Sequence, residues 1–339
     1  MLLALIAPLQ AADVTTVPPF LRGDITVAYG ADIQTGSLQE PVDGSDIQVA
    51  RALHEAHVID FGATFSVAPG AAVYFGVPTW VIDRWSWSEA NAVVFDPNRQ
   101  LGSMAYGEPI GETVTRTGSG SGGVWLGAKG TPFSESFTRR GNASTWLLDV
   151  GFRTPDKSNI YTLDGDSRGA GNGAPALRIR NAFSTTAGQS QPWLEFTWLR
   201  QGVTTADGLE VVNPQVLGVR SGVEVQTYEN AVTNAFFAID FRLGFDYSSW
   251  GDVPSGTYLP TVMESTQGQL VTVGEYSTVS AGLGLYWRMF QYGRIDLYGD
   301  AHYVMPHRLE HPYPVYTGTD TIRVTAGAEL TVLVRTPGE

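Results

Sequence analysis

Apolar and polar residues alternate with a period of two along most of this 339-residue chain. In the stretch GRIDLYGDAHYVM at 293–305, charged residues and a histidine alternate with apolar residues. Successive side chains of a strand point to opposite faces, so one face of this stretch is apolar and the other carries charges of both signs. Helical periodicity is nearly absent from the chain. The pattern therefore predicts an all-β protein.

Twelve strands are expected from this alternation. They cover 24–34, 47–68, 71–86, 122–129, 143–154, 176–187, 191–201, 215–229, 234–248, 269–289, 293–306 and 320–334. No fixed-period repeat and no change in composition typical of a linker interrupts them, so we expect a single barrel domain over residues 13–339. The apolar run before it resembles the hydrophobic part of a secretory signal, and we interpret residues 1–12 as a possible signal-peptide remnant.

The connections between the predicted strands alternate in length. Those after even-numbered strands are short or moderate, such as 68–70, and those after odd-numbered strands are long or moderate, such as 87–121 and 155–175. In an up-and-down barrel this gathers the tight turns at one end and the long loops at the other, as in outer-membrane barrels. We predict a single antiparallel up-and-down transmembrane β-barrel of about twelve strands, with short periplasmic turns and long external loops.

Alternation alone does not show which face points inward. In a soluble barrel the apolar face forms the core, whereas in a membrane barrel it meets lipid. Lipid is favoured because the apolar faces stay free of charge for about ten residues per strand, which is the length a tilted strand needs to cross hydrocarbon. Charged residues make up only 16% of the chain, below the ~25% typical of soluble domains. A soluble twelve-stranded barrel is the alternative.

Aromatic residues lie near both ends of the apolar faces. Amphipathic rings prefer the headgroup zone of a bilayer, so these positions fit the two girdles of a membrane barrel. The predicted interface aromatics are Trp146, Phe237 and Trp287 toward the periplasmic end, and Trp85, Trp198, Tyr247 and Tyr303 toward the external end.

From about residue 24 onward the chain resembles the outer-membrane β-barrels of Gram-negative bacteria. Near its end, TAGAELTV at 325–332 looks like the C-terminal strand signal read by the barrel assembly machinery, with Gly327 followed by Leu330 and Val332. The chain then continues with LVRTPGE instead of stopping at an aromatic residue, as many such proteins do. The resemblance implies an integral protein of a Gram-negative outer membrane, with outer-membrane lipid and the assembly machinery as partners.

The polar faces predict a lumen lined by charges of both signs. The predicted lumen-lining residues are Asp60, Arg84, Lys129, Asp149, Arg153, Arg178, Arg180, Glu195, Arg220, Glu224, Asp240, Arg242, Arg288, Arg294, Asp296, Asp300, His302, Arg323 and Glu329, and the acids Asp24, Asp32 and Asp246 fall on the same faces. Acids and bases nearly balance, and a balanced set does not argue for ion selectivity. The ions either pair across neighbouring strands around a narrow lumen or line an open pore.

Three functions follow from such a barrel. We expect a passive, porin-like channel for small solutes. The alternative is a structural or surface-interaction barrel whose lumen is closed by ion pairs, with a homo-oligomer as one option. A third is an outer-membrane lipid hydrolase, because twelve-stranded membrane barrels include phospholipases and lipid A deacylases, and His302 points inward near Asp300. The chain lacks the phospholipase arrangement of histidine, serine and asparagine, so we expect no enzyme.

The net charge of −13 argues against nucleic acid as a partner, because nucleic acid selects basic faces. Much of the acidic excess lies in the long loops, where Asp164 and Asp166 stand among glycines at 162–175. Clustered carboxylates suit a hard cation such as Ca²⁺. Two aspartates are few ligands, so we expect an ordinary loop there, no metal and no cofactor.

Overall fold

A computed structural model describes residues 15, 17–18, 21–42, 45–89, 114–133, 144–155, 173–206, 209–230, 235–254, 270–290, 293–310 and 315–335. The regular elements in these ranges are all β-strands. No helix in this part of the chain is long and apolar enough to cross a membrane. The possible signal remnant at 1–12 and the loop with Asp164 and Asp166 lie outside the described residues.

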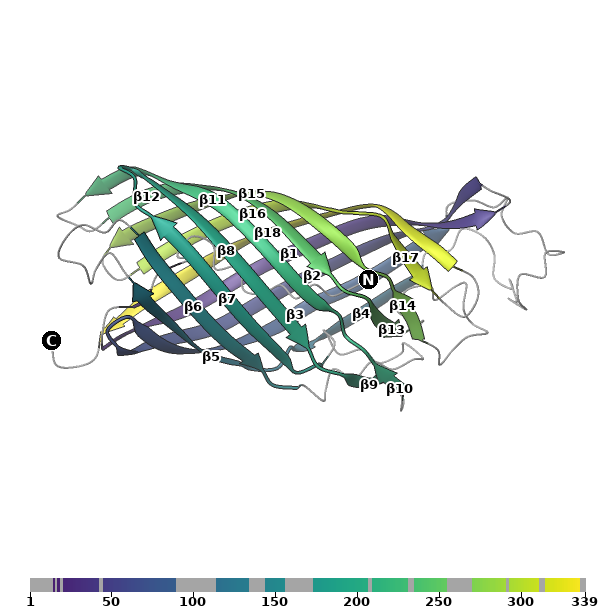
Figure 1. Cartoon of the computed structure of the whole chain (residues 1–339), viewed down its shortest axis with the longest axis horizontal. Coiled ribbons are helices and arrows are strands. Elements are labelled where there is room, and N and C mark those ends of the chain that lie inside the picture. Colours follow the sequence, from purple (N-terminus) through teal and green to yellow (C-terminus); the bar gives the residue numbers. More distant parts are fainter. Residues whose placement is uncertain are drawn as a thin grey trace.

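Twelve strands close into one antiparallel barrel (Figure 1). In chain order they are β1 (Arg22–Val42), β2 (Ser45–Ala68), β3 (Ala71–Glu89), β5 (Trp125–Phe133), β6 (Ser144–Arg153), β7 (Ala176–Thr185), β8 (Ser190–Gln201), β11 (Gln215–Asn230), β12 (Ala235–Ser248), β15 (Tyr276–Phe290), β16 (Gly293–Val304) and β18 (Val315–Arg335). Each strand pairs with the next, and β18 pairs with β1 to close the ring. The predicted fold class is confirmed.

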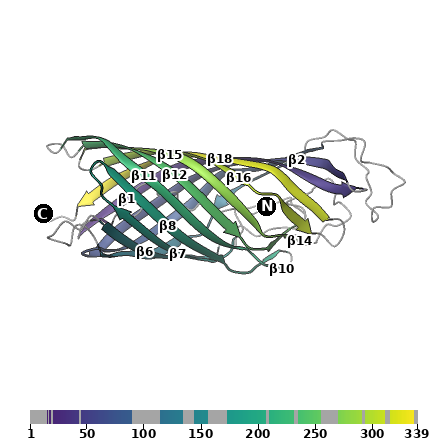
Figure 2. The ribbon, with the colours of Figure 1, turned by 45° about the horizontal axis from the view of Figure 1, so that its top comes forward.

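Short strands extend the wall at the end opposite the tight turns. β4 (Val114–Ser121) pairs with β3, while β13 (Gly251–Pro254), β14 (Leu270–Val273) and β17 (His307–Glu310) form a chain of pairings that joins β18. β9 (Thr204–Ala206) and β10 (Leu209–Val211) form a separate hairpin. With the long strands β1 and β2, these elements project beyond the rest of the barrel (Figures 1 and 2).

Two tight turns owe their shape to glycine. Gly70 connects β2 to β3 and Gly188 connects β7 to β8, and both adopt a positive φ, 72° and 67° respectively. This backbone conformation is the one that glycine tolerates without a steric penalty, and two-residue hairpins require it. These two short connections are therefore tight hairpin turns.

The apolar faces of the strands point away from the barrel axis. On β12, Phe241 and Leu243 are 55% and 65% exposed, whereas their neighbours Asp240 and Arg242 are 0% and 8% exposed. Val324 on β18 is likewise exposed, and large apolar side chains are exposed on strands all around the ring. A continuous apolar belt of this kind is unfavourable in water and fits the hydrocarbon of a bilayer. The soluble barrel is excluded.

Large inward side chains lie along the wall, over glycines of neighbouring strands. A Cβ atom added at Gly222 on β11 would lie 2.5 Å from the ring of Trp193 on β8, and one added at Gly127 on β5 would overlap the ring of Tyr74 on β3. Both glycines thus give the ring the space that a side chain would fill. Because these rings cover the adjacent strand, they line the lumen without crossing it.

Candidate functional site

The lumen wall carries the ionisable residues that the sequence singled out. The structure places the following on inward faces: Asp60, Lys129, Asp149, Arg153, Arg178, Arg180, Glu195, Arg220, Glu224, Asp240, Arg242, Arg288, Arg294, Asp296, Asp300, His302, Arg323 and Glu329. Many are buried, which means that they contact one another or the wall and are not freely hydrated.

Arg84 departs from the predicted set and is corrected here. The pairing of β2 with β3 shifts between His57 and Val58, which leaves an extra residue in β3. A bulge of this kind reverses the faces of the residues that follow it. Asp83 therefore points inward and accepts a 2.7 Å hydrogen bond from His54 Nε2. Arg84 is exposed on the outside, with its guanidinium 3.5 Å from the carboxylate of Glu55.

One ionic network covers the wall from β3 to β8. The Tyr74 hydroxyl donates to Asp149 Oδ1 at 2.7 Å, and Arg180 lies 3.2 Å from Asp149 Oδ2 and 3.4 Å from Glu195 Oε2. Arg178 donates to the Tyr74 hydroxyl at 3.1 Å. The carboxylates and guanidinium groups are buried, so each needs these partners to offset its lost hydration.

A second group of pairs covers the wall from β12 round to β1. Arg242 Nε lies 2.8 Å from Asp300 Oδ1, reaching across Gly282 of the intervening strand β15. Arg323 contacts both carboxylate oxygens of Asp32, with Nε 2.9 Å from Oδ1 and Nη2 2.7 Å from Oδ2. Planar two-point contacts of this kind fix the geometry as well as the charge. These distances show ion pairs between nearby strands of the wall.

Asp240 is held by neutral donors. The Trp193 indole donates to one carboxylate oxygen at 2.9 Å and the Tyr286 hydroxyl to the other at 3.3 Å. This arrangement was not predicted, because Trp193 and Tyr286 were not among the expected lumen residues. Their positions, alternating with the apolar residues of β8 and β15, are the signal that could have revealed it.

His302 stands next to a threonine. Its Nε2 lies 3.3 Å from Thr325 Oγ1, and the nearby Asp300 carboxylate is engaged by Arg242. Serine hydrolysis needs a nucleophile, a base and an orienting group linked by hydrogen bonds. His302 and its described contacts do not form that chain. In the described ranges, no group of three or more histidine, aspartate or glutamate residues could hold a metal ion.

A chain of polar contacts marks the outer face just beyond the apolar belt. His57 links the Tyr29 hydroxyl to Glu55, and Glu55 faces Arg84. The hydrogen bond from His57 lowers the pKa of the Glu55 carboxyl below its usual range, and the charge of Arg84 acts in the same direction. Glu55, His57 and Arg84 lie on the external side of the membrane-spanning part of β2 and β3, and the Tyr29 side chain reaches them from the outer face of β1.

Thr15 and Val17, which precede β1, lie inside the barrel at the periplasmic end. The Thr15 hydroxyl hydrogen-bonds the inward Ser184 hydroxyl at 2.8 Å, and both side chains are buried. Val17 packs against the inward cluster of Leu147, Ala182 and Trp193. These contacts place residues of the segment before β1 within this mouth of the lumen.

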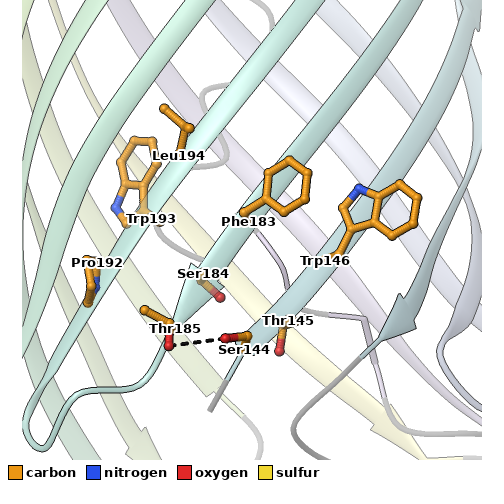
Figure 3. A pocket seen from close by; sticks show the side chains of 9 residues that line it. All are labelled: Ser144, Thr145, Trp146, Phe183, Ser184, Thr185, Pro192, Trp193 and Leu194. Carbon is orange, nitrogen blue, oxygen red and sulfur yellow. Dashed lines mark hydrogen bonds between the residues drawn. The ribbon is translucent and has the colours of Figure 1, made fainter. Parts of the chain in front are cut away.

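The outer face of the same wall contains an apolar hollow of about 700 Å³ (Figure 3). Its residues come from β6, β7 and β8, and Trp146 stacks on Phe183 with ring centroids 6.0 Å apart. Ser144 donates to the Thr185 hydroxyl at its edge. Stacked aromatic rings beside hydroxyl groups suit the boundary between lipid tails and headgroups.

The other predicted interface aromatics also lie on the outer face near strand ends. Phe237 and Trp287 are ladder partners near the periplasmic turns, and Trp198, Tyr247 and Tyr303 lie toward the external ends of β8, β12 and β16. Trp85 is on β3, but its side chain falls outside the described part of the structure.

No protein-family model matches the chain, and no curated protein matches it either. Among solved structures it is similar to the COG4313 outer membrane channel from Pseudomonas putida F1, with a TM-score of 0.52, 11% identity and coverage of 95% of this chain and 98% of that one. A Pseudomonas aeruginosa FadL homologue follows at a TM-score of 0.40 and 11% identity, covering 92% and 90%. The outer membrane protease OmpT from Escherichia coli has a TM-score of 0.37 at 8% identity, covering 95% and 100%.

The similarity to the Pseudomonas putida protein, at such low identity, concerns the fold alone. Together with the closed ring, the apolar belt and the ionic lumen, it defines the class of the protein. The chain is an outer-membrane β-barrel, integral to the membrane, as the resemblance implied.

Proposed function

We propose that the barrel passes small solutes passively through its lumen. The observation that carries this proposal is the course of the side-chain contacts. The inward hydrogen bonds and ion pairs described above join strands at most three places apart in the ring, the widest being Arg178 with Tyr74. Opposite walls of a twelve-stranded ring are six places apart. Because these contacts run along the wall and do not cross the lumen, the space along the barrel axis is left open to water and solutes.

The similarity to the Pseudomonas putida protein supports the same proposal. The structure of that protein is described as an outer membrane channel, and the match extends over nearly the whole of both chains. Twelve strands also give a barrel wider than the eight-stranded type that side chains fill. The solute is proposed only as small and water-soluble.

Planar-bilayer recording tests the proposal. The purified barrel, checked for folding by its heat-modifiable mobility on a gel, should produce single-channel current steps when added to the bilayer. A heat-unfolded sample of the same preparation is the matched control and should give none. Folded protein that inserts into the bilayer without producing current steps would contradict the proposal.

The second candidate is a barrel with a closed lumen that acts as a structural or surface-interaction protein. Two observations favour it: the Arg153 guanidinium is fully engaged with the Ala174 carbonyl at 3.1 and 2.7 Å, and the N-terminal segment enters the periplasmic mouth. Folded, inserted protein without current would support this candidate. A homo-oligomer acting through the acidic loops belongs to it, and cross-linking in the membrane would detect that oligomer.

A catalytic role is not proposed. Phospholipid incubated with the purified protein should stay intact, whether or not the protein carries His302→Ala. Hydrolysis that disappears with this substitution would contradict that expectation. The barrel assembly machinery and outer-membrane lipid are the partners we propose for its insertion.

A further inference from the structure

The bulge in β3 changes the charge of the lumen, since it brings an acid inward and sends a base outward. The inward acids of the described strands are Asp24, Asp32, Asp60, Asp83, Asp149, Glu195, Glu224, Asp240, Asp246, Asp296, Asp300 and Glu329; the inward bases are Lys129, Arg153, Arg178, Arg180, Arg220, Arg242, Arg288, Arg294 and Arg323, with Arg22 at the periplasmic mouth. The balance that the sequence suggested becomes an acidic excess.

At least six of these acids pair with an arginine along the wall, and Asp60 belongs to none of the described pairs. Asp32, Asp149, Glu195, Asp246, Asp296 and Asp300 each face an arginine within 4.0 Å. Asp60 on β2 makes no hydrogen bond or ion pair with any described residue, and its side chain is partly exposed to the lumen. Its carboxylate is therefore available to a passing ion.

A second carboxylate stands beside Asp60. Ala28 of β1 pairs with Asp60 on one side and with Glu329 of β18 on the other. Since the alanine side chain is a single methyl group, the two acids face each other across it, and their charges interact. Arg178 is the base whose charge reaches Asp60, but its guanidinium is already held by Tyr74 and Asp149.

The two acids lie level with the apolar belt. Phe61, which follows Asp60, and Leu330, which follows Glu329, are exposed to the surroundings of the barrel, as is Val27 beside Ala28. At this depth the wall is bounded by hydrocarbon, so the field of the Asp60 carboxylate is weakly screened and is concentrated in the water of the lumen. Acidic side chains lining a pore favour cations for that reason.

We propose that the lumen selects cations over anions, with Asp60 and Glu329 as its main determinants. This inference rests on the proposed passive channel and names the class of solute that the channel prefers. A cation at this level meets two carboxylates across β1, whereas an anion meets their repulsion. Arg178, the arginine whose charge reaches Asp60, is engaged by Tyr74 and Asp149.

The reversal potential in a KCl gradient across a planar bilayer tests it. The full chain should give a potential with the sign of the K⁺ equilibrium potential. Asp60→Asn combined with Glu329→Gln should move that potential toward zero, while Asp60→Glu should keep it. The matched control is Glu55→Gln, which removes a carboxylate from the outer face of the same strand β2 and should change nothing.

Each outcome is decisive once gel mobility shows that the variants fold. A wild-type reversal potential at zero or of the anion sign overturns cation selection. A potential unmoved by the double substitution overturns the role of Asp60 and Glu329. No current at all in the wild type would instead be the failure of the proposed channel, so the two claims are tested separately.

Discussion

The buried guanidinium groups of the lumen are held by carboxylates or carbonyl oxygens, and this pairing decides which substitutions the wall tolerates. Arg242 and Asp300 have side chains only 7% and 6% exposed, and they are joined at 2.8 Å. Arg84 and Glu55 form a longer pair at 3.5 Å, with the arginine side chain 45% exposed. A buried charge that loses its partner cannot recover its hydration, whereas an exposed one can.

Arg242→Ala should therefore destabilise the barrel by ~3–5 kcal/mol, because it leaves Asp300 buried without its counter-ion. The free energy of unfolding in urea, measured with the protein in lipid vesicles, checks this. Arg84→Ala is the matched control and should cost about 0–1 kcal/mol. Equal losses for the two variants would show that the inward pair is as well solvated as the outer one.

At the scale of strands, alternation predicted all twelve barrel strands and their order. Its limit is the bulge at the end of β3, because counting by two fails once an extra residue enters one strand. It also merged β14 with β15, which Gly274 and Glu275 separate, since both pieces alternate. The hairpin of β9 and β10 lies in a connection that looked like plain loop, since three-residue strands are too short to show a period.

The lumen residues were predictable where strands run without interruption, as on β12 and β16. The donors that hold Asp240 were not, because the pairing register of the strands is not known from the sequence. Trp193 reaches Asp240 from β8 over Gly222 of β11, and Tyr286 reaches it diagonally from the neighbouring strand β15. The entry of Thr15 and Val17 into the periplasmic mouth was equally hidden, since no local pattern connects residue 15 to Ser184.

The N-terminal segment should restrict the periplasmic mouth that it occupies. A chain beginning at residue 19 should conduct more per channel than one beginning at residue 13, because it lacks the residues that contact Ser184 and the Leu147 cluster. Single-channel conductance of the two chains in the same bilayer and salt makes the comparison. Equal single-channel conductance of the two chains would contradict this prediction, because it would mean that the segment does not narrow the path of the ions.

At the scale of the whole molecule, the belt of exposed apolar side chains sets the cost of placing charge on the outside. Phe241 lies near the middle of β12 and Tyr247 near its external end. Phe241→Arg should cost ~2–4 kcal/mol and Tyr247→Arg about 0–1 kcal/mol, since the penalty for a cation falls from the bilayer midplane to the interface. Unfolding free energies in vesicles test this gradient, and a reversed order would contradict the placement of the bilayer.

The central claim is that one face of the wall meets lipid and the other encloses water, and the absence of cysteine from the chain makes it directly measurable. Single-cysteine variants Asp60→Cys and Phe241→Cys would be reconstituted in vesicles and treated with a small, charged thiol reagent. We predict rapid modification of the Asp60→Cys variant, with a fall in its channel current, and protection of the Phe241→Cys variant. Modification of the Phe241→Cys variant together with protection of the Asp60→Cys variant would contradict the account.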